Sequence, residues 1–286
     1  MKILIIGKNS YIGEHVKKYL TSFEHDVSEF DVEHEELTEE IFNNIDSVIH
    51  VAAIVHRKDI TDYELYKRIN VDLPYKVAQL AKNKGVKQFV FLSTMAVYEQ
   101  GKSLKGNWLD ENSKCIPQSL YGKSKYEAEL CLNTLQDDNF KVCHIRPANV
   151  YGKDCKGSYM SSFKKIVQKL PCIPIAYEHV KQGMIYIENL TELVRLIVEN
   201  QAKGIFPAQD ATPVSSVDLM IEIANVIKIK KKKSKVFGLP FKIFRISLVK
   251  KLYGGVAYTS QYAKTDLGDY CLYSFSEGIK RTFMDN

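Results

Sequence analysis

Short apolar runs alternate with helical patterns through the first 151 residues, and this alternation constrains the fold more than any other feature. The predicted strands are Lys2–Gly7, Asp26–Asp31, Ser47–Ala53, Gln88–Thr94 and Val142–Ile145. The segments between them predict helices at Tyr11–Leu20, Glu35–Ile45, Asp62–Lys84 and Gln118–Leu135. Strands alternating with helices of this length favour a parallel, doubly wound α/β sheet that binds its ligands at the carboxyl ends of the strands.

The turn from Gly7 to Gly13 (GKNSYIG) joins the first predicted strand to the first predicted helix. Gly7 permits a tight turn and Gly13 permits close packing, while the helix N-terminus offers free N–H groups to a pyrophosphate. Ser10 stands where the usual pattern has its middle glycine. An ordinary βα turn can carry the same two glycines. We expect a dinucleotide to bind here, at Gly7, Ser10, Tyr11, Ile12 and Gly13.

The residues near this turn leave the choice of cofactor open. Asp31 ends the second predicted strand, where a carboxylate can bind the ribose hydroxyls of adenosine and so favours NAD. The same Asp31 could instead cap a helix or lie near the adenine ring. Lys8 favours NADP, because a cation at the turn could meet the 2′-phosphate. The expected cofactor is therefore NAD or NADP.

Beyond Gly152 the alternation gives way to loops, prolines and short elements, without a repeat or a linker. We predict a Rossmann-type doubly wound parallel sheet in residues 1–151, forming the NAD(P)-binding domain. Residues 152–286 should form mainly a smaller C-terminal substrate-binding lobe. A segment of about 182–210 should return to the sheet.

Composition narrows the class of protein. Hydrophobic residues make up 45% of the 286 residues, enough for a substantial core. No run reaches the ~18 apolar residues of a membrane span, and Ile3–Ile6 is too short for a signal peptide, so we expect a cytoplasmic protein. The six cysteines and seven histidines lack metal-ligand spacing, so we expect reduced thiols and no metal site.

One segment of the chain is strongly basic, because no acidic residue occurs between Glu222 and Asp266. It carries Lys228, Lys230, Lys231, Lys232, Lys233, Lys235, Lys242, Arg245, Lys250 and Lys251, with Phe237, Phe241, Phe244 and Tyr253 among them. Such a segment suits a phosphorylated ligand, a nucleic acid or an anionic membrane surface, and equally a solvated surface. We expect no nucleic-acid partner, and at most a weak peripheral membrane contact through residues 228–251.

Tyr121 and Lys125 are spaced to share one face of the last predicted helix. A free tyrosine is a poor base at neutral pH because its pKa lies near ~10. A cation held beside it would lower that pKa and make the phenol a usable proton donor and acceptor. The pair is common in helices, so its meaning depends on the rest of the chain.

Taken together, the motifs resemble the extended short-chain dehydrogenase/reductases, particularly the NAD(P)-dependent nucleotide-sugar epimerases, dehydratases and reductases. The resemblance covers nearly the whole chain and rests on the order and spacing of Gly7–Gly13, Val51–Ala53, Asn70, Leu92–Thr94, Tyr121–Lys125 and Arg146–Gly152. It implies a nucleotide-sugar substrate and a homodimer. It also adds Ala52, Ala53, Asn70 and Pro147 to the expected cofactor-binding residues.

The resemblance implies catalytic roles for Thr94, Tyr121 and Lys125. Thr94 would hydrogen-bond the sugar oxygen that is oxidised or reduced, and Tyr121 would give or take its proton. Lys125 would hold the nicotinamide ribose and lower the pKa of the phenol. Pro147 lies where the family cradles the nicotinamide ring. Asn149 lies where the family binds the phosphates of the nucleotide sugar.

The family often carries an arginine just before the strand that matches Met184–Ile187, where it grips the diphosphate. This chain has Gln182 at that position, with Lys181 beside it. A lysine can act only as a point charge, so Lys181 is the expected substrate-binding cation and a bidentate clamp is absent.

The resemblance leaves three reactions to compare. Relatives that are 4,6-dehydratases place an Asp-Glu pair directly after the catalytic threonine, whereas Met95 and Ala96 follow here and disfavour dehydration. A 4-ketoreductase and a 4-epimerase both need only Thr94, Tyr121 and Lys125. The chain length and the short segment between the second and third strands favour a reductase by a narrow margin. Its expected substrate is a UDP-linked 4-keto-6-deoxy (amino)sugar for a bacterial capsule or O-antigen polysaccharide.

Two alternatives accompany this expectation. The first is a UDP-hexose 4-epimerase with tightly bound NAD. The second is a non-enzymatic dinucleotide sensor or nucleic-acid-binding protein, which the basic segment suggests. We place the second last, because such proteins can dispense with Tyr121 and Lys125 and this chain has both.

Overall fold

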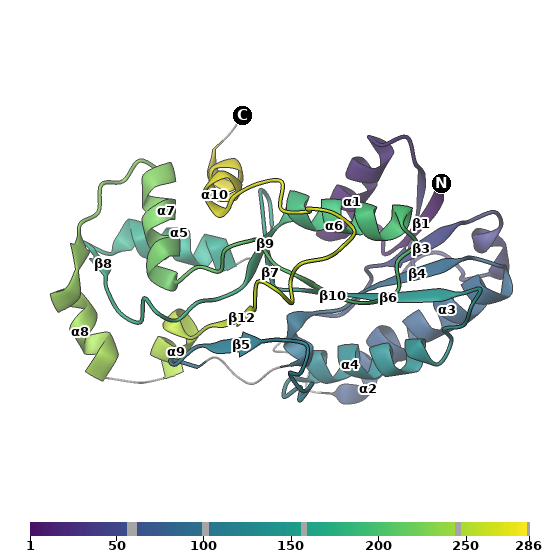
Figure 1. The fold of residues 1–286 in the computed structure, drawn as a ribbon, viewed down its shortest axis with the longest axis horizontal. Coiled ribbons are helices and arrows are strands. Elements are labelled where there is room, and N and C mark those ends of the chain that lie inside the picture. Colours follow the sequence, from purple (N-terminus) through teal and green to yellow (C-terminus); the bar gives the residue numbers. More distant parts are fainter. Residues whose placement is uncertain (56–61, 99–102, 156–158, 244–246, 285–286) are drawn as a thin grey trace.

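The centre of the molecule is a six-stranded parallel sheet with the strand order β10-β6-β4-β3-β1-β2 (Figure 1). The computed structural model describes residues 1–55, 62–98, 103–155, 159–243 and 247–284. The strands of this sheet are β1 (Lys2–Ile6), β2 (Asp26–Phe30), β3 (Ser47–His50), β4 (Gln88–Leu92), β6 (Lys141–Pro147) and β10 (Gly204–Ala208). Every pair in it is parallel, which confirms the predicted α/β class with a Rossmann-like sheet.

Helices cover both faces of the sheet (Figure 1). One layer holds α1 (Tyr11–Thr21) and α6 (Ile187–Glu199), and the other holds α2 (Tyr63–Lys67), α3 (Leu73–Asn83) and α4 (Leu120–Asn133). The buried strand residues are almost all apolar because both faces are covered, as β1 shows with Ile3, Leu4, Ile5 and Ile6 at 4% exposure or less.

The remaining elements form a second group, which extends from the middle of the molecule to the end away from the N-terminus (Figure 1). Its helices are α5 (Tyr159–Lys169), α7 (Ser216–Val226), α8 (Lys235–Ile243), α9 (Ser247–Tyr253) and α10 (Phe275–Phe283). Its short parallel strand pairs are β5 (Asn107–Leu109) with β12 (Val256–Tyr258), β7 (Asn149–Tyr151) with β9 (Met184–Tyr186), and β8 (Ile173–Pro174) with β11 (Lys233–Ser234). No helix in the described ranges is long and apolar enough to cross a membrane.

The strand order reverses beside β1, and this reversal positions the ligand site. The chain passes from β1 to β2 on one side, then returns to β3 on the other, so Ile3 lies opposite both Val27 and Ser47. Two connections that leave in opposite directions open a crevice at the carboxyl ends of the strands. The predicted cofactor turn follows β1 at this point.

Two predicted helices differ from the structure. The segment predicted as a helix at Glu35–Ile45 contains only the 3₁₀ turn η1 (Glu39–Phe42). Before it, Asp31 accepts from the backbone of Glu33, and Glu35 accepts from the backbone of Asp31, so side chains replace helical hydrogen bonds. The long helix predicted at 62–84 is interrupted by the π turn η2 (Arg68–Asp72), which separates α2 from α3.

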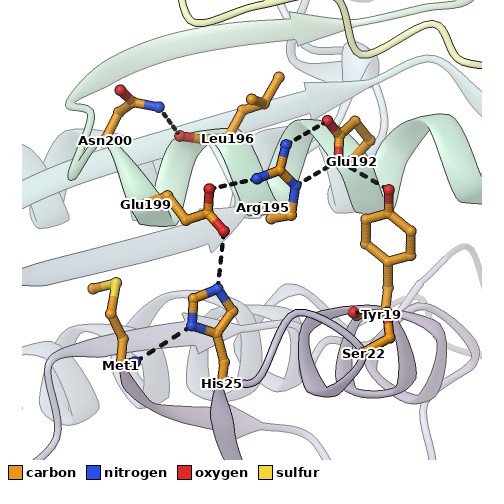
Figure 2. A network of polar contacts seen from close by, with 9 residues as sticks. All are labelled: Met1, Tyr19, Ser22, His25, Glu192, Arg195, Leu196, Glu199 and Asn200. Carbon is orange, nitrogen blue, oxygen red and sulfur yellow. Dashed lines mark hydrogen bonds and ion pairs between the residues drawn. The ribbon is translucent and has the colours of Figure 1, made fainter.

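Helix α6 is an element that the sequence pattern did not identify. Ten of its 13 residues are buried, and its charged stripe (Glu188, Glu192, Arg195 and Glu199) does not simply face solvent. Its charged side chains instead join it to α1 and to the start of β2 (Figure 2). Arg195 donates two hydrogen bonds of 2.7 Å to the carboxylate of Glu192 and a third to Glu199. Tyr19 of α1 donates to Glu192 at 3.0 Å, and His25 contacts Glu199 at 3.0 Å.

We predict that Arg195→Leu lowers the free energy of unfolding by about 2–4 kcal/mol, because it leaves the buried carboxylate of Glu192 without its cation. The Glu192 side chain is only 7% exposed. The matched control is Lys67→Met, which breaks a pair with Asp72 whose side chains are 39% and 55% exposed and should cost below about 1 kcal/mol. Urea unfolding measures both, and equal losses would contradict the role given to Arg195.

Candidate active site

The turn after β1 has the geometry of a pyrophosphate-binding loop. Gly7 has a φ of +121°, and a Cβ atom there would lie 2.8 Å from the backbone nitrogen of Ala52, so a side chain is excluded. Ser10 is the N-cap of α1, and its hydroxyl accepts from the Gly13 N–H at 3.0 Å. The N–H groups of Tyr11 and Ile12 stand before the first intrahelical hydrogen bond of α1 and point out of the helix N-terminus. Ser10 thus replaces the usual glycine and caps the helix.

Asn70 holds the loop after β3 against helix α4. Its side chain accepts from the Ile54 N–H and donates to the Ile54 carbonyl, both at 2.9 Å, and it also donates to the hydroxyl of Ser124 at 2.9 Å. Asn70 is fully buried, and both hydrogens of its amide nitrogen are used. We therefore expect it to act on a cofactor through the position of this loop, which carries the half-buried Ala52 and Ala53.

Asp31 follows β2 and lies close to the glycine turn. One carboxylate oxygen accepts from the Glu33 N–H at 3.0 Å, and the other contacts the His34 ring at 3.1 Å. These contacts lower the pKa of Asp31, the Glu33 hydrogen bond most, so the carboxylate stays charged. Its further lone pairs are available to ribose hydroxyls. The backbone N–H of Lys8 donates to the Phe30 carbonyl at 3.3 Å, so Lys8 also lies at the end of this strand, and both NAD and NADP remain compatible with the turn.

The two predicted catalytic hydroxyls meet at the carboxyl end of β4. Thr94 caps the 3₁₀ turn η3 (Met95–Val97), where its hydroxyl accepts from the Ala96 N–H at 3.2 Å. Gly122 packs on this turn so closely that a Cβ atom would lie 2.6 Å from the Ala96 carbonyl oxygen. This approach of α4 allows the side chain of Tyr121 to hydrogen-bond that of Thr94.

Lys125 lies one helical turn after Tyr121 on the same face of α4. It is 1% exposed, and its Nζ atom lies 3.8 Å from the centroid of the Phe91 ring. Within the described residues this nitrogen has no hydrogen-bond partner. Burial lowers the pKa of Lys125 to about 7, although Glu129 raises it slightly. A buried amine without an acceptor is costly, and ribose hydroxyls would supply acceptors, so the site fits a nicotinamide dinucleotide.

The expected effect of Lys125 on the pKa of Tyr121 is not seen in the structure. Burial raises the pKa of Tyr121 to about 12, and the hydrogen bond with Thr94 only partly opposes this. An amine with a pKa of about 7 is largely uncharged above neutral pH, so it cannot lower the pKa of its neighbour as a fixed cation would. The expectation assumed a charged lysine and left out its burial.

A buried ion pair beside the site was missing from the sequence analysis. Glu129 and Arg146 are 2% and 3% exposed, and Arg146 Nε donates to the Glu129 carboxylate at 3.0 Å. Arg146 also donates to the hydroxyl of Tyr98 at 2.6 Å, and Ser93 donates to Glu129. The sequence does contain a pattern that points to Glu129, because Glu129 follows Lys125 by four residues, as Lys125 follows Tyr121.

Two of the predicted substrate residues, Asn149 and Lys181, follow β6, whose last residue is the predicted cofactor-binding Pro147. Pro147 is buried at the end of β6, and the side chain of Asn149 donates to the Gly183 carbonyl at 3.1 Å, which joins β7 to β9. The Nζ atom of Lys181 donates to the carboxylate of Asp218 at 2.8 Å. The positive charge of Lys181 is therefore already compensated, which weakens it as the sole cation for a diphosphate.

The sequence matches a known family model over most of the sheet-forming part of the chain. Residues 3–207 match the model described as the NAD dependent epimerase/dehydratase family. The chain is 29% identical over 217 residues to the UDP-glucose 4-epimerase of Vibrio cholerae, a match that covers 74% of this chain and 64% of that protein. It is 26% identical over 219 residues to the N-acetyl-alpha-D-glucosaminyl-diphospho-ditrans,octacis-undecaprenol 4-epimerase of Escherichia coli O157:H7, covering 71% and 64%. The chain thus spans 64% of the length of each of these curated relatives.

A solved structure has the same fold over nearly the whole chain. It is the dTDP-4-dehydrorhamnose reductase of Clostridium acetobutylicum, with a TM-score of 0.70 and 21% identity, and the match covers 98% of this chain and 97% of that one. At this identity the likeness shows the fold alone.

We predict that binding of reduced nicotinamide cofactor takes up close to one proton near pH 8. Lys125, with a pKa of about 7, is mostly neutral there, and hydrogen bonds to ribose oxygens would raise its pKa toward the ordinary value near ~10. Titration calorimetry in buffers of different ionisation enthalpy measures the uptake. Lys125→Met should abolish it, while Lys123→Met, an exposed change on the same helix, should keep it. Equal uptake by wild type and Lys125→Met would contradict the assignment.

We also predict strong coupling between Glu129 and Arg146. Arg146→Met leaves a buried carboxylate and should cost about 3–5 kcal/mol, whereas the further change Glu129→Leu removes that charge and should recover part of the loss. A double-mutant cycle by chemical unfolding should give a coupling above about 2 kcal/mol. The exposed pair Glu277 and Arg281, at 48% and 37%, is the control and should couple below about 1 kcal/mol. Similar coupling in both pairs would contradict the prediction.

Proposed function

Because the chain belongs to the NAD dependent epimerase/dehydratase family, we propose that it moves a hydride between NAD(P) and C4 of a nucleotide-linked hexose. Residues 1–151 would bind the cofactor, and residues 152–286 would bind mainly the sugar nucleotide. The observation that carries the proposal is the hydrogen bond between Thr94 and Tyr121, with the buried Lys125 amine one helical turn away.

Each of these three residues has a role that follows from its chemistry. The bound nicotinamide would supply or accept the hydride. The Thr94 hydroxyl would hold the C4 oxygen of the sugar, and the Tyr121 phenol would exchange a proton with it. The Lys125 amine would bind the cofactor ribose and thereby set the distance between the two reactants.

Reduction of a 4-keto sugar is the first candidate for the direction of the reaction. Burial raises the pKa of Tyr121 to about 12, so the phenol holds its proton at neutral pH and can give it to the alkoxide formed at C4. The adenosine side of the crevice is bounded by the edge strand β2, and only the 3₁₀ turn η1 lies between β2 and β3. This limited cover favours a cofactor that exchanges after each turnover.

The proposed substrate is a UDP-linked 4-keto-6-deoxy (amino)sugar, whose product would enter a bacterial capsule or O-antigen polysaccharide. This part of the proposal rests on the resemblance to nucleotide-sugar enzymes. Asn149 and Lys181 would face the diphosphate. Since Asp218 already pairs with Lys181, the lysine would share its charge between the carboxylate and the ligand.

A sugar 4-epimerase is the second candidate, and the names of both curated relatives favour it. Epimerisation needs the same three residues, because the hydride leaves C4 and returns to its other face. It differs in that the cofactor is regenerated in each turnover and can stay bound.

The test is consumption of NADPH or NADH by purified protein with a UDP-4-keto-6-deoxyhexose. We predict that Tyr121→Phe lowers kcat by about 10²–10⁴-fold, because it removes the proton donor. Tyr126→Phe removes a hydroxyl from the same helix and should leave kcat within about threefold, as expected for a group outside the reaction.

The outcomes separate the candidates. Absence of cofactor consumption, together with NAD⁺ retained through purification and interconversion of two UDP-hexoses, would reject the reductase in favour of the epimerase. Absence of both activities, or full activity of Tyr121→Phe, would reject hydride transfer at this site.

A further inference from the structure

Helix α8 is attached to the rest of the molecule along one side. Gly238 is buried against the backbone of Ile175, and the Phe241 ring packs on that of Tyr253 with centroids 5.6 Å apart. Tyr177 adds a hydrogen bond from its hydroxyl to the Phe241 carbonyl. This side of α8 is therefore its attachment to the lobe.

The other side of α8 presents aliphatic side chains to solvent. Val236, Leu239 and Ile243 are 83%, 53% and 62% exposed. Their spacing of three and four residues places them on one face, which we call the α8 apolar face. Helical spacing also puts this face opposite Gly238 and Phe241, so the helix turns most of its apolar surface away from the core. A partner that covered the α8 apolar face would remove this apolar surface from water, which is favourable.

Lysines flank the α8 apolar face. Lys235 and Lys242 are exposed and, at 3.6 residues per turn, lie side by side along one edge of the face. Lys230, Lys232 and Lys233 precede the helix, and no acidic residue occurs between Glu222 and Asp266 to neutralise them along the chain. Phe244 and Arg245, which belong to the same basic segment, lie outside the described residues. An exposed aliphatic face edged by lysines has the chemistry of an interfacial helix.

We propose that the α8 apolar face and its flanking lysines bind the surface of an anionic lipid bilayer. The three aliphatic side chains would enter the boundary between headgroups and acyl chains, and the lysines would contact the anionic headgroups. A helix of nine residues is too short to span a bilayer and would lie in its plane.

The chemistry of the face disfavours two other partners. Single-stranded nucleic acids are bound by stacking on aromatic rings, whereas Val236, Leu239 and Ile243 are aliphatic and Phe237, 40% exposed, lies beside this face and not on it. A second copy of the chain, docked by the same face, would place lysines against lysines. An anionic lipid bilayer offers acyl chains to the three aliphatic side chains and negatively charged headgroups to the lysines.

Helix α8 is connected to the substrate side of the proposed active site through α9 and β12. Helix α8 lies at the end of the molecule away from the N-terminus (Figure 1). The chain continues through α9 into β12, where the Val256 carbonyl accepts from the Gly183 N–H at 2.8 Å. Gly183 in turn accepts from Asn149, a proposed substrate residue. The docking itself is independent of the proposed reaction.

The test is co-sedimentation of the full chain, without cofactor or sugar, with vesicles of phosphatidylglycerol and phosphatidylcholine or of phosphatidylcholine alone. We expect binding to the anionic vesicles at low salt, at least about tenfold weaker binding at 0.5 M salt, and little binding to the neutral vesicles. The triple variant Val236→Ser, Leu239→Ser, Ile243→Ser should bind at least about tenfold more weakly. Lys235→Glu with Lys242→Glu should weaken binding comparably. The matched control changes three exposed aliphatic residues elsewhere, Ile116→Ser, Leu130→Ser and Leu272→Ser, and should bind as wild type does.

Several results would overturn the proposal. These are no binding of wild type to anionic vesicles at low salt, equal binding to neutral vesicles, or equal binding by wild type and the α8 triple variant. Analytical ultracentrifugation that shows the triple variant losing a dimer, without vesicle binding by wild type, would assign the face to a second copy. Binding to a single-stranded oligonucleotide but not to vesicles would assign it to nucleic acid. Circular dichroism verifies that each variant compared is folded. Because the experiment measures no turnover, failure of the membrane proposal would not contradict the proposed reaction.

Discussion

The buried ion pair between Glu129 and Arg146 is the contact on which the arrangement of the candidate site depends. It joins helix α4, which carries Tyr121 and Lys125, to strand β6, which leads to the substrate side. Two charged residues that are only 2–3% exposed are tolerated only when each has its partner and further hydrogen bonds. The hydroxyl of Tyr98 accepts one such hydrogen bond from Arg146. Because the pair stabilises a single position of α4, it fixes where the phenol and the amine stand relative to the ends of the strands.

Burial of the site sets its protonation states before any ligand binds. The same desolvation that lowers the pKa of Lys125 to about 7 raises that of Tyr121 to about 12, so both groups prefer to be neutral. A neutral phenol is a proton donor, and a neutral amine without a hydrogen-bond partner is ready for a ligand hydroxyl. Before a ligand binds, the lysine is therefore better described as a neutral hydrogen-bonding group than as a permanent charge beside the tyrosine.

Much of the fold followed from local patterns, and the departures have physical causes. The apolar runs of β1, β3, β4 and β6 could be placed because strands covered on both faces are almost wholly apolar. Helix α6 was missed although its charged and apolar residues recur at helical spacing, so the signal for a helix was present in the sequence. The helix expected after β2 is only a short 3₁₀ turn, since Asp31 and Glu35 bond the backbone there instead. In the fold the carboxylates of Glu192 and Glu199 contact Arg195 of the same helix, Tyr19 of α1 and His25 just before β2.

The parallel α/β class, the glycine turn that closes β1, and the position of Tyr121 and Lys125 on one helical face could be read from the sequence, because they depend on residue type and spacing along the chain. Three contacts could be learned only from the folded chain: Tyr121 hydrogen-bonds Thr94, Lys181 pairs with Asp218, and Lys125 is buried against Phe91. Such contacts join residues that are distant in sequence. Their burial, which no local pattern encodes, is what sets charge and pKa.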